Sequence, residues 1–237
     1  MAYSYVQQGS ASGGSGVNSL LTSSITTTAG NILILAWVIG NSTSENPTTV
    51  SDATNGNYTS VGGSFNHNNS LFGGTTTGFY FFPNIAGGSV QATVKWTTGG
   101  GYSYAYLLEY SGIKTTSPAD GFNAISTQTS TNPSLSITAT TGDLCMFMFA
   151  DDSLMSAGNI NNRVNIGSGE IIIGDAAAVG GSFTSSFTAA SGHWCAGTAG
   201  FLLAPVVSGK GCSIFLEITT YISCVRRLQT SPHFVLG

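Results

Sequence analysis

One pattern occurs twice in the chain, and this duplication restricts the fold more than any other feature. Residues 25–36 and residues 137–148 each consist of a Thr-rich segment, a Gly and an apolar segment. The similarity continues downstream, where residues 87–90 and 180–183 each place two glycines before a Ser/Thr-rich segment and an aromatic closing segment. A spacing of roughly a hundred residues is too long for a solenoid, so the copies are interpreted as two halves of one core.

Two similar strand sets joined by one connector predict an all-β fold, specifically an antiparallel two-sheet β-sandwich of the jelly-roll type. The 237 residues, 41% of them hydrophobic, are enough for one large core. We expect an N-terminal strand and Gly/Ser linker over residues 1–16, the sandwich over residues 17–204 and a C-terminal extension over residues 205–237. Residues 111–130 are expected to connect the two halves.

The apolar pattern of individual segments agrees with strands. Residues 32–39 are all apolar, which is typical of a strand that is buried on both faces. Residues 90–96 alternate apolar and polar side chains, as a half-buried strand does, and the glycines at 99–101 then reverse the chain. Tyr102, Tyr104 and Tyr106 are expected on one face of the returning strand.

Three turn and strand signatures, at residues 28–34, 50–59 and 109–118, resemble a widespread β-sandwich module of phage structural and bacterial surface proteins. The resemblance covers about residues 1–204 and ends after Pro205. It implies a jelly-roll-like sandwich with a structural or adhesive role, and it transfers no catalytic residues.

The charge content argues against several partners. Only 7% of the residues are charged, against about 25% in ordinary soluble proteins. The net charge is -4, and the six Lys and Arg form no basic stripe, so neither nucleic-acid binding nor attraction to a membrane surface is expected. Residues 1–8 do not read as a signal peptide, and no apolar run is long enough to insert into a bilayer. A hydroxyl-rich exterior without an export signal is expected of a virion or extracellular protein that assembles in the cytoplasm.

The four cysteines do not form a recognisable disulfide or zinc pattern. Cys145 and Cys195 lie in apolar segments and are expected to be free, buried thiols. Cys212 and Cys224 lie in the C-terminal extension without the spacing of a zinc site, and a bridge between them is the weaker alternative.

Each enzyme hypothesis lacks residues that the reaction needs, so no catalytic residue, cofactor or metal is predicted. No Gly-x-Ser-x-Gly elbow occurs, and His67, His193 and His233 give no triad pattern. No Glu-x-Glu or Glu-x-Asp pair is available for glycoside hydrolysis. Glu109, an acid within an apolar strand, is interpreted as a residue of a polar face.

Two sets of side chains could bind a ligand. Asp52, Asn55 and Asn57 offer oxygen ligands for calcium, although the closing Glu of an EF-hand is missing. Tyr102, Tyr104 and Tyr106 could stack on sugar rings if their face is exposed, and His67, in the Asn-rich loop 66–69, is a further possible glycan-binding residue. The alternative is that the tyrosines belong to the core.

We therefore expect a non-enzymatic structural protein, a phage virion component of decoration, fibre or tail type, that self-assembles or docks on a particle. The alternatives are an adhesive module that binds a receptor or a host-surface glycan, and a glycoside hydrolase with an unrecognised acid pair. Assembly is assigned to terminal strands that contain Tyr3, Tyr5 and Gln7 at one end and Ile214, Leu216 and Ile218 at the other.

Overall fold

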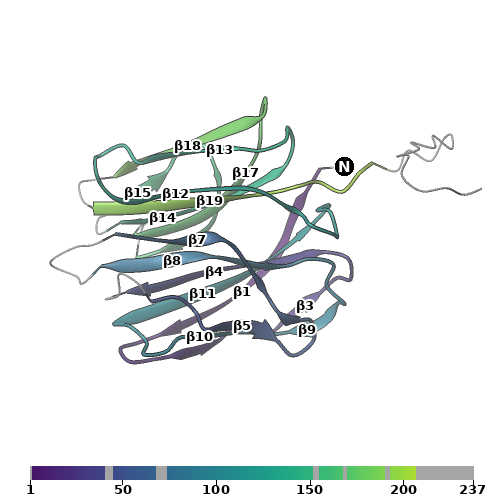
Figure 1. The fold of residues 1–237 in the computed structure, drawn as a ribbon, viewed down its shortest axis with the longest axis horizontal. Helices are drawn as coiled ribbons and strands as arrows, with labels where there is room; N and C mark the ends of the chain where they lie inside the picture. Colours follow the sequence, from purple (N-terminus) through teal and green to yellow (C-terminus); the bar gives the residue numbers. More distant parts are fainter. Residues whose placement is uncertain are drawn as a thin grey trace, which may run out of the picture. The chain divides into compact units, whose positions relative to one another are not determined.

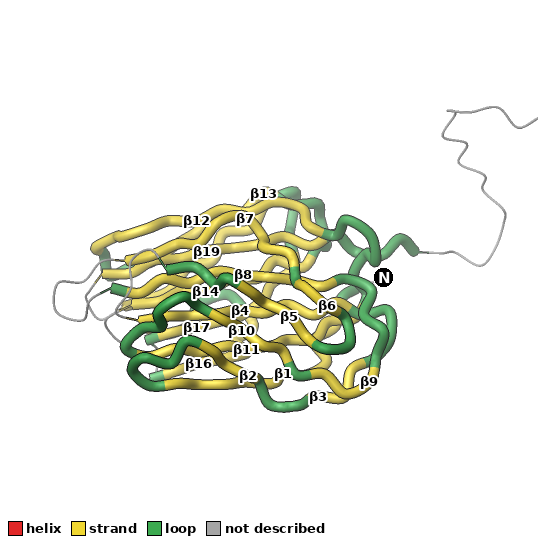
Figure 2. The backbone as a smooth tube through the Cα atoms, turned by 60° about the horizontal axis from the view of Figure 1, so that its bottom comes forward, coloured by secondary structure: helices red, strands yellow, loops and turns green. Residues whose placement is uncertain are grey.

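The computed structural model describes residues 2–40, 45–67, 74–151, 155–167, 170–189 and 193–206. These residues form strands and no helix, so none of them builds a helical membrane span. Contacts within the chain join the residues up to Val206 into one compact unit. All strand pairs are antiparallel, as in β1 with β11 and β14 with β19, which confirms the expectation of an all-β protein with antiparallel sheets. Figure 2 shows strands joined by loops throughout this unit.

The two copies of the duplicated pattern are here named repeat 1 and repeat 2. Repeat 1 consists of β1 (Ser4–Gly13), β2 (Ser19–Leu21), β3 (Ile25–Thr27), β4 (Ile32–Gly40), β5 (Thr49–Asp52), β6 (Gly56–Asn57), β7 (Thr59–His67), β8 (Thr75–Phe82), β9 (Gly88–Val90), β10 (Ala92–Lys95) and β11 (Tyr102–Ser111). Repeat 2 consists of β12 (Ala119–Thr129), β13 (Ser134–Thr138), β14 (Leu144–Asp151), β15 (Met155–Ala157), β16 (Asn161–Ile166), β17 (Ile171–Ala177), β18 (Ser182–Ala189) and β19 (His193–Phe201).

Both repeats build the same central sheet. Its strand order is β1-β11-β4-β8-β7 in repeat 1 and β12-β19-β14-β17-β16 in repeat 2. The first strand of each repeat therefore pairs with the last, and the strand that follows the Gly turn lies in the middle. The duplication seen in the sequence is a duplication of topology.

The turn before the middle strand is also the same. Gly30 donates its backbone N–H to the carbonyl oxygen of Ile85 at 2.9 Å, and Gly142 donates to that of Ala178 at 2.8 Å. The two glycines have φ angles of 85° and 94°. Side chains with a Cβ rarely adopt this conformation, so both turns need glycine.

The sheets stack in four layers rather than in the two that the sequence predicted. Residues of both central sheets, among them Ile34, Phe79, Met146 and Ile173, fill the space between them and form a shared core. Sheet β2-β10-β5-β6 covers the outer side of the central sheet of repeat 1, and β13-β18-β15 covers that of repeat 2. The pair β3-β9 completes five sheets among the described residues. Figure 1 shows these layers from β13 and β18 at the top to β5 and β10 below.

The middle strand of each central sheet is buried on both faces, which two sheets alone could not achieve. Every residue of β4 and of β14 is buried, as predicted for residues 32–39. In β4, Ile32 and Ile34 face the shared core, whereas Leu33 and Leu35 face the outer core of repeat 1. A strand that is apolar on both sides needs a layer on each side.

Two segments differ from their predicted roles. Gly9 to Gly13, expected within a linker, continue β1 along β11. A Cβ at Gly9 would lie 2.7 Å from the carbonyl oxygen of Ser23, so this glycine permits a close backbone approach and does not provide flexibility. Much of the expected connector forms β12, which pairs with β19 and buries part of Phe122 against the shared core.

Candidate functional site

Two of the predicted assembly residues, one just before β1 and one within it, point into the molecule itself. Tyr3 and Tyr5 are half-buried and pack against the shared core. Both rings meet Tyr110 edge to face, with centroids 6.2 and 5.6 Å from its ring. The guanidinium carbon of Arg163 lies 4.4 Å from the centroid of Tyr5, which is a cation–π contact. These tyrosines therefore join the two repeats.

Asp175 is the centre of a polar network at this junction. Its carboxylate is completely buried, and Oδ1 accepts hydrogen bonds from the Tyr3 hydroxyl at 3.2 Å and the Asn161 amide at 3.0 Å. Oδ2 accepts from the Tyr110 hydroxyl at 2.8 Å, and Arg163 forms a salt bridge with both oxygens. Burial and the adjacent carboxylate raise the pKa of Tyr110 well above its ordinary value. The network stabilises contact between the repeats and leaves the carboxylate no free oxygen.

Gln7, the third predicted residue of β1, belongs to a different network. A β-bulge between Tyr5 and Gln7 shifts the alternation of the strand, so Gln7 lies on the opposite face of the sheet. Its amide donates to Oε2 of the buried Glu109 at 2.6 Å. Oε1 of Glu109 accepts from the backbone N–H of Thr28 at 2.8 Å and from the Asn31 amide at 2.6 Å. Glu109 therefore has a structural role and does not lie on a polar face.

The exposed side chains of β1 are uncharged and mostly small. They are Ser4, Val6, Gln8, Ser10 and Ser12. Strand β1 is an edge strand of the central sheet. Exposed edges in natural proteins are commonly protected by charged residues, by Pro or by a covering segment. This edge has no charge and no Pro, but Ser23 covers its middle: the Ser23 backbone N–H donates to the carbonyl oxygen of Ser10 at 2.9 Å, and the Ser10 N–H donates to the Ser23 hydroxyl at 3.1 Å.

The predicted aromatic row lies beside this edge. Tyr104 and Tyr106 on β11 are half-buried, and in the register of the sheet they lie opposite Ser12 and Ser10. Tyr102 packs against Tyr104 with ring centroids 5.9 Å apart. All three rings also contact the shared core, so the row is partly core, and sugar binding by it stays a prediction. We call Gln8, Ser10, Ser12, Tyr104 and Tyr106 the β1 strip.

The backbone of His67 is separated from that of the tyrosines by two intervening strands. His67 is the last residue of β7 and pairs with Thr75, which pairs with Gly40, which pairs with Tyr102. Three strand spacings of about 4.8 Å separate the backbones of His67 and Tyr102. The side chain of Tyr102 nevertheless crosses β4, because its hydroxyl and that of Thr75, the strand partner of His67, are 2.9 Å apart. Joint sugar binding by His67 and the row stays a prediction. The remaining predicted assembly residues, Ile214, Leu216 and Ile218, lie outside the described part of the chain.

The candidate calcium loop is closed by its own hydrogen bonds. Oδ1 of Asp52 accepts from the backbone N–H groups of Thr54 at 2.7 Å and Asn55 at 2.6 Å. Oδ2 accepts from the Asn55 amide at 2.9 Å and the Tyr58 hydroxyl at 2.7 Å. Four donors on one carboxylate form a self-contained turn. In the described residues, no three His, Cys, Asp or Glu side chains gather as a metal ion would require.

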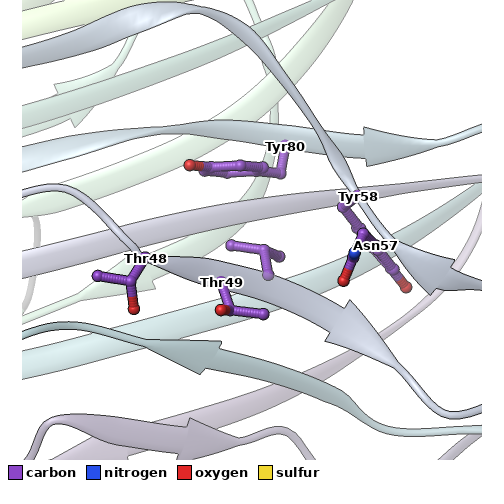
Figure 3. A pocket seen from close by; sticks show the side chains of 6 residues that line it. Thr48, Thr49, Asn57, Tyr58 and Tyr80 are labelled. Carbon is purple, nitrogen blue, oxygen red and sulfur yellow. The ribbon is translucent and has the colours of Figure 1, made fainter.

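A pocket of about 300 Å³ opens beside this turn. It is lined by Thr48, Thr49, Val50, Asn57, Tyr58 and Tyr80. Figure 3 shows the ring of Tyr80 edge-on above Thr48 and Thr49, with Asn57 and Tyr58 at the other end. The lining contains hydroxyl, amide and aromatic groups and no charge, which suits a neutral polar ligand.

Sequence reasoning did not identify Asp175 or this pocket. Asp175 lies in an apolar strand, and its partners are Tyr3, just before β1, and residues of β11 and β16, which only the folded topology brings together. The pocket residues Thr48 and Tyr80 lie on segments that are distant in sequence and have no common motif. The two predicted thiols, in contrast, are confirmed, because Cys145 and Cys195 are free and buried.

Comparison of the chain with protein-family models, with curated proteins and with solved structures finds no match.

Proposed function

We propose that the protein is a non-enzymatic structural component of a phage virion, of decoration, fibre or tail type, which assembles with its own copies or docks on a particle. On this proposal each repeat is a jelly-roll-like sandwich, and the protein functions in the virion or outside the cell after assembly in the cytoplasm. The observation that supports it most is the β1 strip, an uncharged surface on an edge strand that has neither charge nor Pro and that Ser23 covers at Ser10.

The use of the buried acids agrees with this role. Asp175, Glu109 and Asp52 each accept several hydrogen bonds from neighbouring protein groups. A general acid or nucleophile needs a carboxyl oxygen that can reach a substrate. These three carboxylates instead fix strands and turns, which favours a rigid body that presents surfaces to other proteins.

The low charge supports dense packing of copies. A net charge of -4 over 237 residues gives little repulsion between neighbours. Serine and tyrosine side chains on the β1 strip can form hydrogen bonds and aromatic contacts across an interface without burying an unpaired charge. We therefore assign assembly to Gln8, Ser12 and Tyr104 of the strip, and propose that the segment with Ile214, Leu216 and Ile218 adds a second contact.

Light scattering after size-exclusion chromatography tests the proposal on the full chain. We expect wild type to form a defined oligomer and the double variant Gln8→Lys/Ser12→Lys to shift toward monomer, because charges on an edge prevent pairing. Ser134→Lys, on the exposed side of β13, is the matched control and is expected to keep the oligomer. A chain that ends at Ala204 tests the second contact.

Two results would contradict assembly through these surfaces. One is a wild-type protein that stays monomeric at every concentration reached. The other is an oligomer that persists unchanged in the lysine double variant and in the shortened chain. The virion assignment is tested separately by immunogold labelling of particles released when the source cells lyse, where unlabelled particles would argue against it.

The pocket favours a second candidate, an adhesive module that binds a neutral sugar. The ring of Tyr80 offers a stacking face, and Thr49 and Asn57 supply a hydroxyl and an amide. Tyr58 is held in place because its hydroxyl donates to Asp52 at 2.7 Å. Sugar-binding sites commonly combine an aromatic face with such polar groups.

Glycan-array binding distinguishes this candidate from assembly alone. If the pocket binds sugar, Tyr80→Ala abolishes the array signal while Tyr104→Ala, in the β1 strip, retains it. Loss in the Tyr104 variant alone would instead place sugar binding on the aromatic row. A wild-type array without signal would remove the adhesive candidate and leave the structural one.

A further inference from the structure

The two repeats differ in one residue of their shared turn. Asn31 and Asp143 follow the equivalent glycines, and each donates its backbone N–H three residues back, to the carbonyl oxygens of Thr28 and Thr140. An amide side chain in repeat 1 is therefore replaced by a carboxyl in repeat 2. Since the backbones are the same, repeat 1 serves as an internal reference for repeat 2.

In repeat 1 the turn is held by the carboxylate of Glu109, whose partners in the turn each carry a hydrogen to donate. Glu109 on β11 pairs with Leu33 and accepts from the Thr28 N–H and the Asn31 amide at 2.8 and 2.6 Å. The amide of Asn31 carries its own hydrogens at every pH. This arrangement needs no added proton.

In repeat 2 the carboxylate comes from another strand. The equivalent of Leu33 is Cys145, which pairs with Gly200, so the position of Glu109 has no side chain. Asp120 of β12 supplies the carboxylate that bonds this turn, and its Oδ2 accepts from the backbone N–H and the hydroxyl of Thr140 at 3.0 and 3.1 Å. The carbonyl oxygen of the same Thr140 accepts the backbone N–H of Asp143 at 3.0 Å, so the carboxyl of Asp120 lies beside the turn that carries Asp143, and each carboxyl shifts the pKa of the other.

Two carboxyls thus meet where repeat 1 has an amide and a carboxylate. Asp143 is only 2% exposed, and its Oδ1 accepts from the backbone N–H of Leu203 at 3.1 Å. Its Oδ2 is buried, and in the described part of the chain no amide, hydroxyl or cationic donor reaches it. Two ionised carboxylates would repel each other here, whereas one added proton supplies the missing donor.

We propose that Asp120 and Asp143 share one proton and form an acid-stabilised clasp, which ties the turn before β14 to β12 and to Leu203. The clasp closes the end of repeat 2 next to the last described residues, where Ala204 donates its N–H to the carbonyl oxygen of Gly112 at 2.8 Å. It gives repeat 2 a loss of stability at rising pH that the amide of Asn31 does not give repeat 1.

The surroundings determine the sign of this response. Burial raises the pKa of Asp143 above its ordinary value, and Asp120 raises it further against the lowering effect of the Leu203 N–H. The Thr140 N–H lowers the pKa of Asp120. The other titratable group nearby is Cys145, whose thiol stays neutral because burial raises its pKa to about 12.

The stability conferred by the proton on Asp143 is present at acidic pH and is lost as the pH rises through the raised pKa of Asp143. The contribution of ionised Asp120 acts in the opposite sense and is lost as the pH falls through its lowered pKa. Between these two values the pair holds one proton, and the clasp is closed. Above them both groups ionise and the clasp opens.

Exchanging the residues between the repeats tests the proposal. Asp143→Asn gives repeat 2 the amide of repeat 1, and we expect its thermal midpoint to exceed that of wild type by at least about 2 °C near pH 8 and by less near pH 5. Asn31→Asp gives repeat 1 a carboxyl pair with Glu109. We expect the thermal midpoint of this variant to fall as the pH rises. If the variant folds only in acid, the fall is measured over the acidic range in which it is folded.

The outcome that overturns the clasp is an Asp143→Asn variant with the same pH dependence as wild type. Nuclear magnetic resonance of the aspartate carboxyl carbons in the wild-type chain gives a test that does not require a folded variant. We expect one aspartate to titrate above its ordinary pKa of about 3.9, and this signal to disappear in Asp143→Asn. If every aspartate titrates at or below that value, the pair does not share a proton.

Discussion

Asp175 allows a quantitative test of how the two repeats are joined. The substitution Asp175→Ala removes a completely buried carboxylate and leaves the buried Tyr110 hydroxyl without its acceptor at 2.8 Å. It also leaves Arg163 without its partner, although 24% of that side chain is exposed and keeps some hydration. Removing one member of a buried ion pair costs about 3–5 kcal/mol of unfolding free energy.

Urea unfolding followed by circular dichroism measures this loss. For a domain of this size, 3–5 kcal/mol corresponds to a fall in thermal midpoint of roughly 6–20 °C, since each kcal/mol lowers it by about 2–4 °C. Arg163→Met alone is expected to cost less, because its side chain is partly exposed. In the double variant the losses are expected to fall short of additivity by about 0.5–3 kcal/mol, as for groups in one network.

A loss below about 1 kcal/mol for Asp175→Ala would refute the reasoning, because it would mean that the carboxylate contributes no more than an ordinary neutral hydrogen bond. Additivity of the two single variants within about 0.5 kcal/mol would refute the coupling. Tyr3→Phe removes only the donor at 3.2 Å and serves as the mild reference for the network.

Two further predictions concern packing and thiol chemistry. Gly197→Ala places a Cβ 2.0 Å from the ring of Phe65, so we expect urea unfolding to show a loss of about 1–3 kcal/mol in unfolding free energy. The control is Gly63→Ala, whose Cβ would have no atom within 4 Å and which is expected to change that free energy by less than about 0.5 kcal/mol. Burial raises the pKa of the thiols of Cys145 and Cys195, so we expect both to resist iodoacetamide in the folded protein and to react in urea. Mass spectrometry of the labelled peptides measures this, and modification of either thiol in the native state would disprove it.

The sequence predicted the elements better than it predicted their arrangement. The apolar run of β4 indicated burial on both faces, and the repeated Thr-Gly pattern indicated two related strand sets. The number of layers was missed because alternation within one strand does not reveal which other strands cover it. The split of β4 between Leu33 and Ile34, and that of β14 between Cys145 and Met146, show that each repeat has its own outer sheet.

Individual site residues were harder to predict because a single bulge reverses their direction. In β1, strict alternation from Tyr3 would place Gln7 on the same face as Tyr5. The irregularity between them moves Gln7 to the other side, where it meets Glu109. Tyr3 and Tyr5, which looked available for partners, are used within the molecule, and the exposed positions of β1 are Ser4, Val6, Gln8, Ser10 and Ser12.

The shared core has a consequence for any attempt to divide the protein. Repeat 1 contributes Ile34 and Phe79 to this core, and repeat 2 contributes Met146 and Ile173, so each repeat has a large apolar face toward the other. A half-length polypeptide would expose that apolar face to water and would need a second copy to cover it. The intact chain thus resembles a dimer whose subunits have been fused, and cutting it between β11 and β12 should yield fragments that are insoluble apart and recover their fold only when mixed.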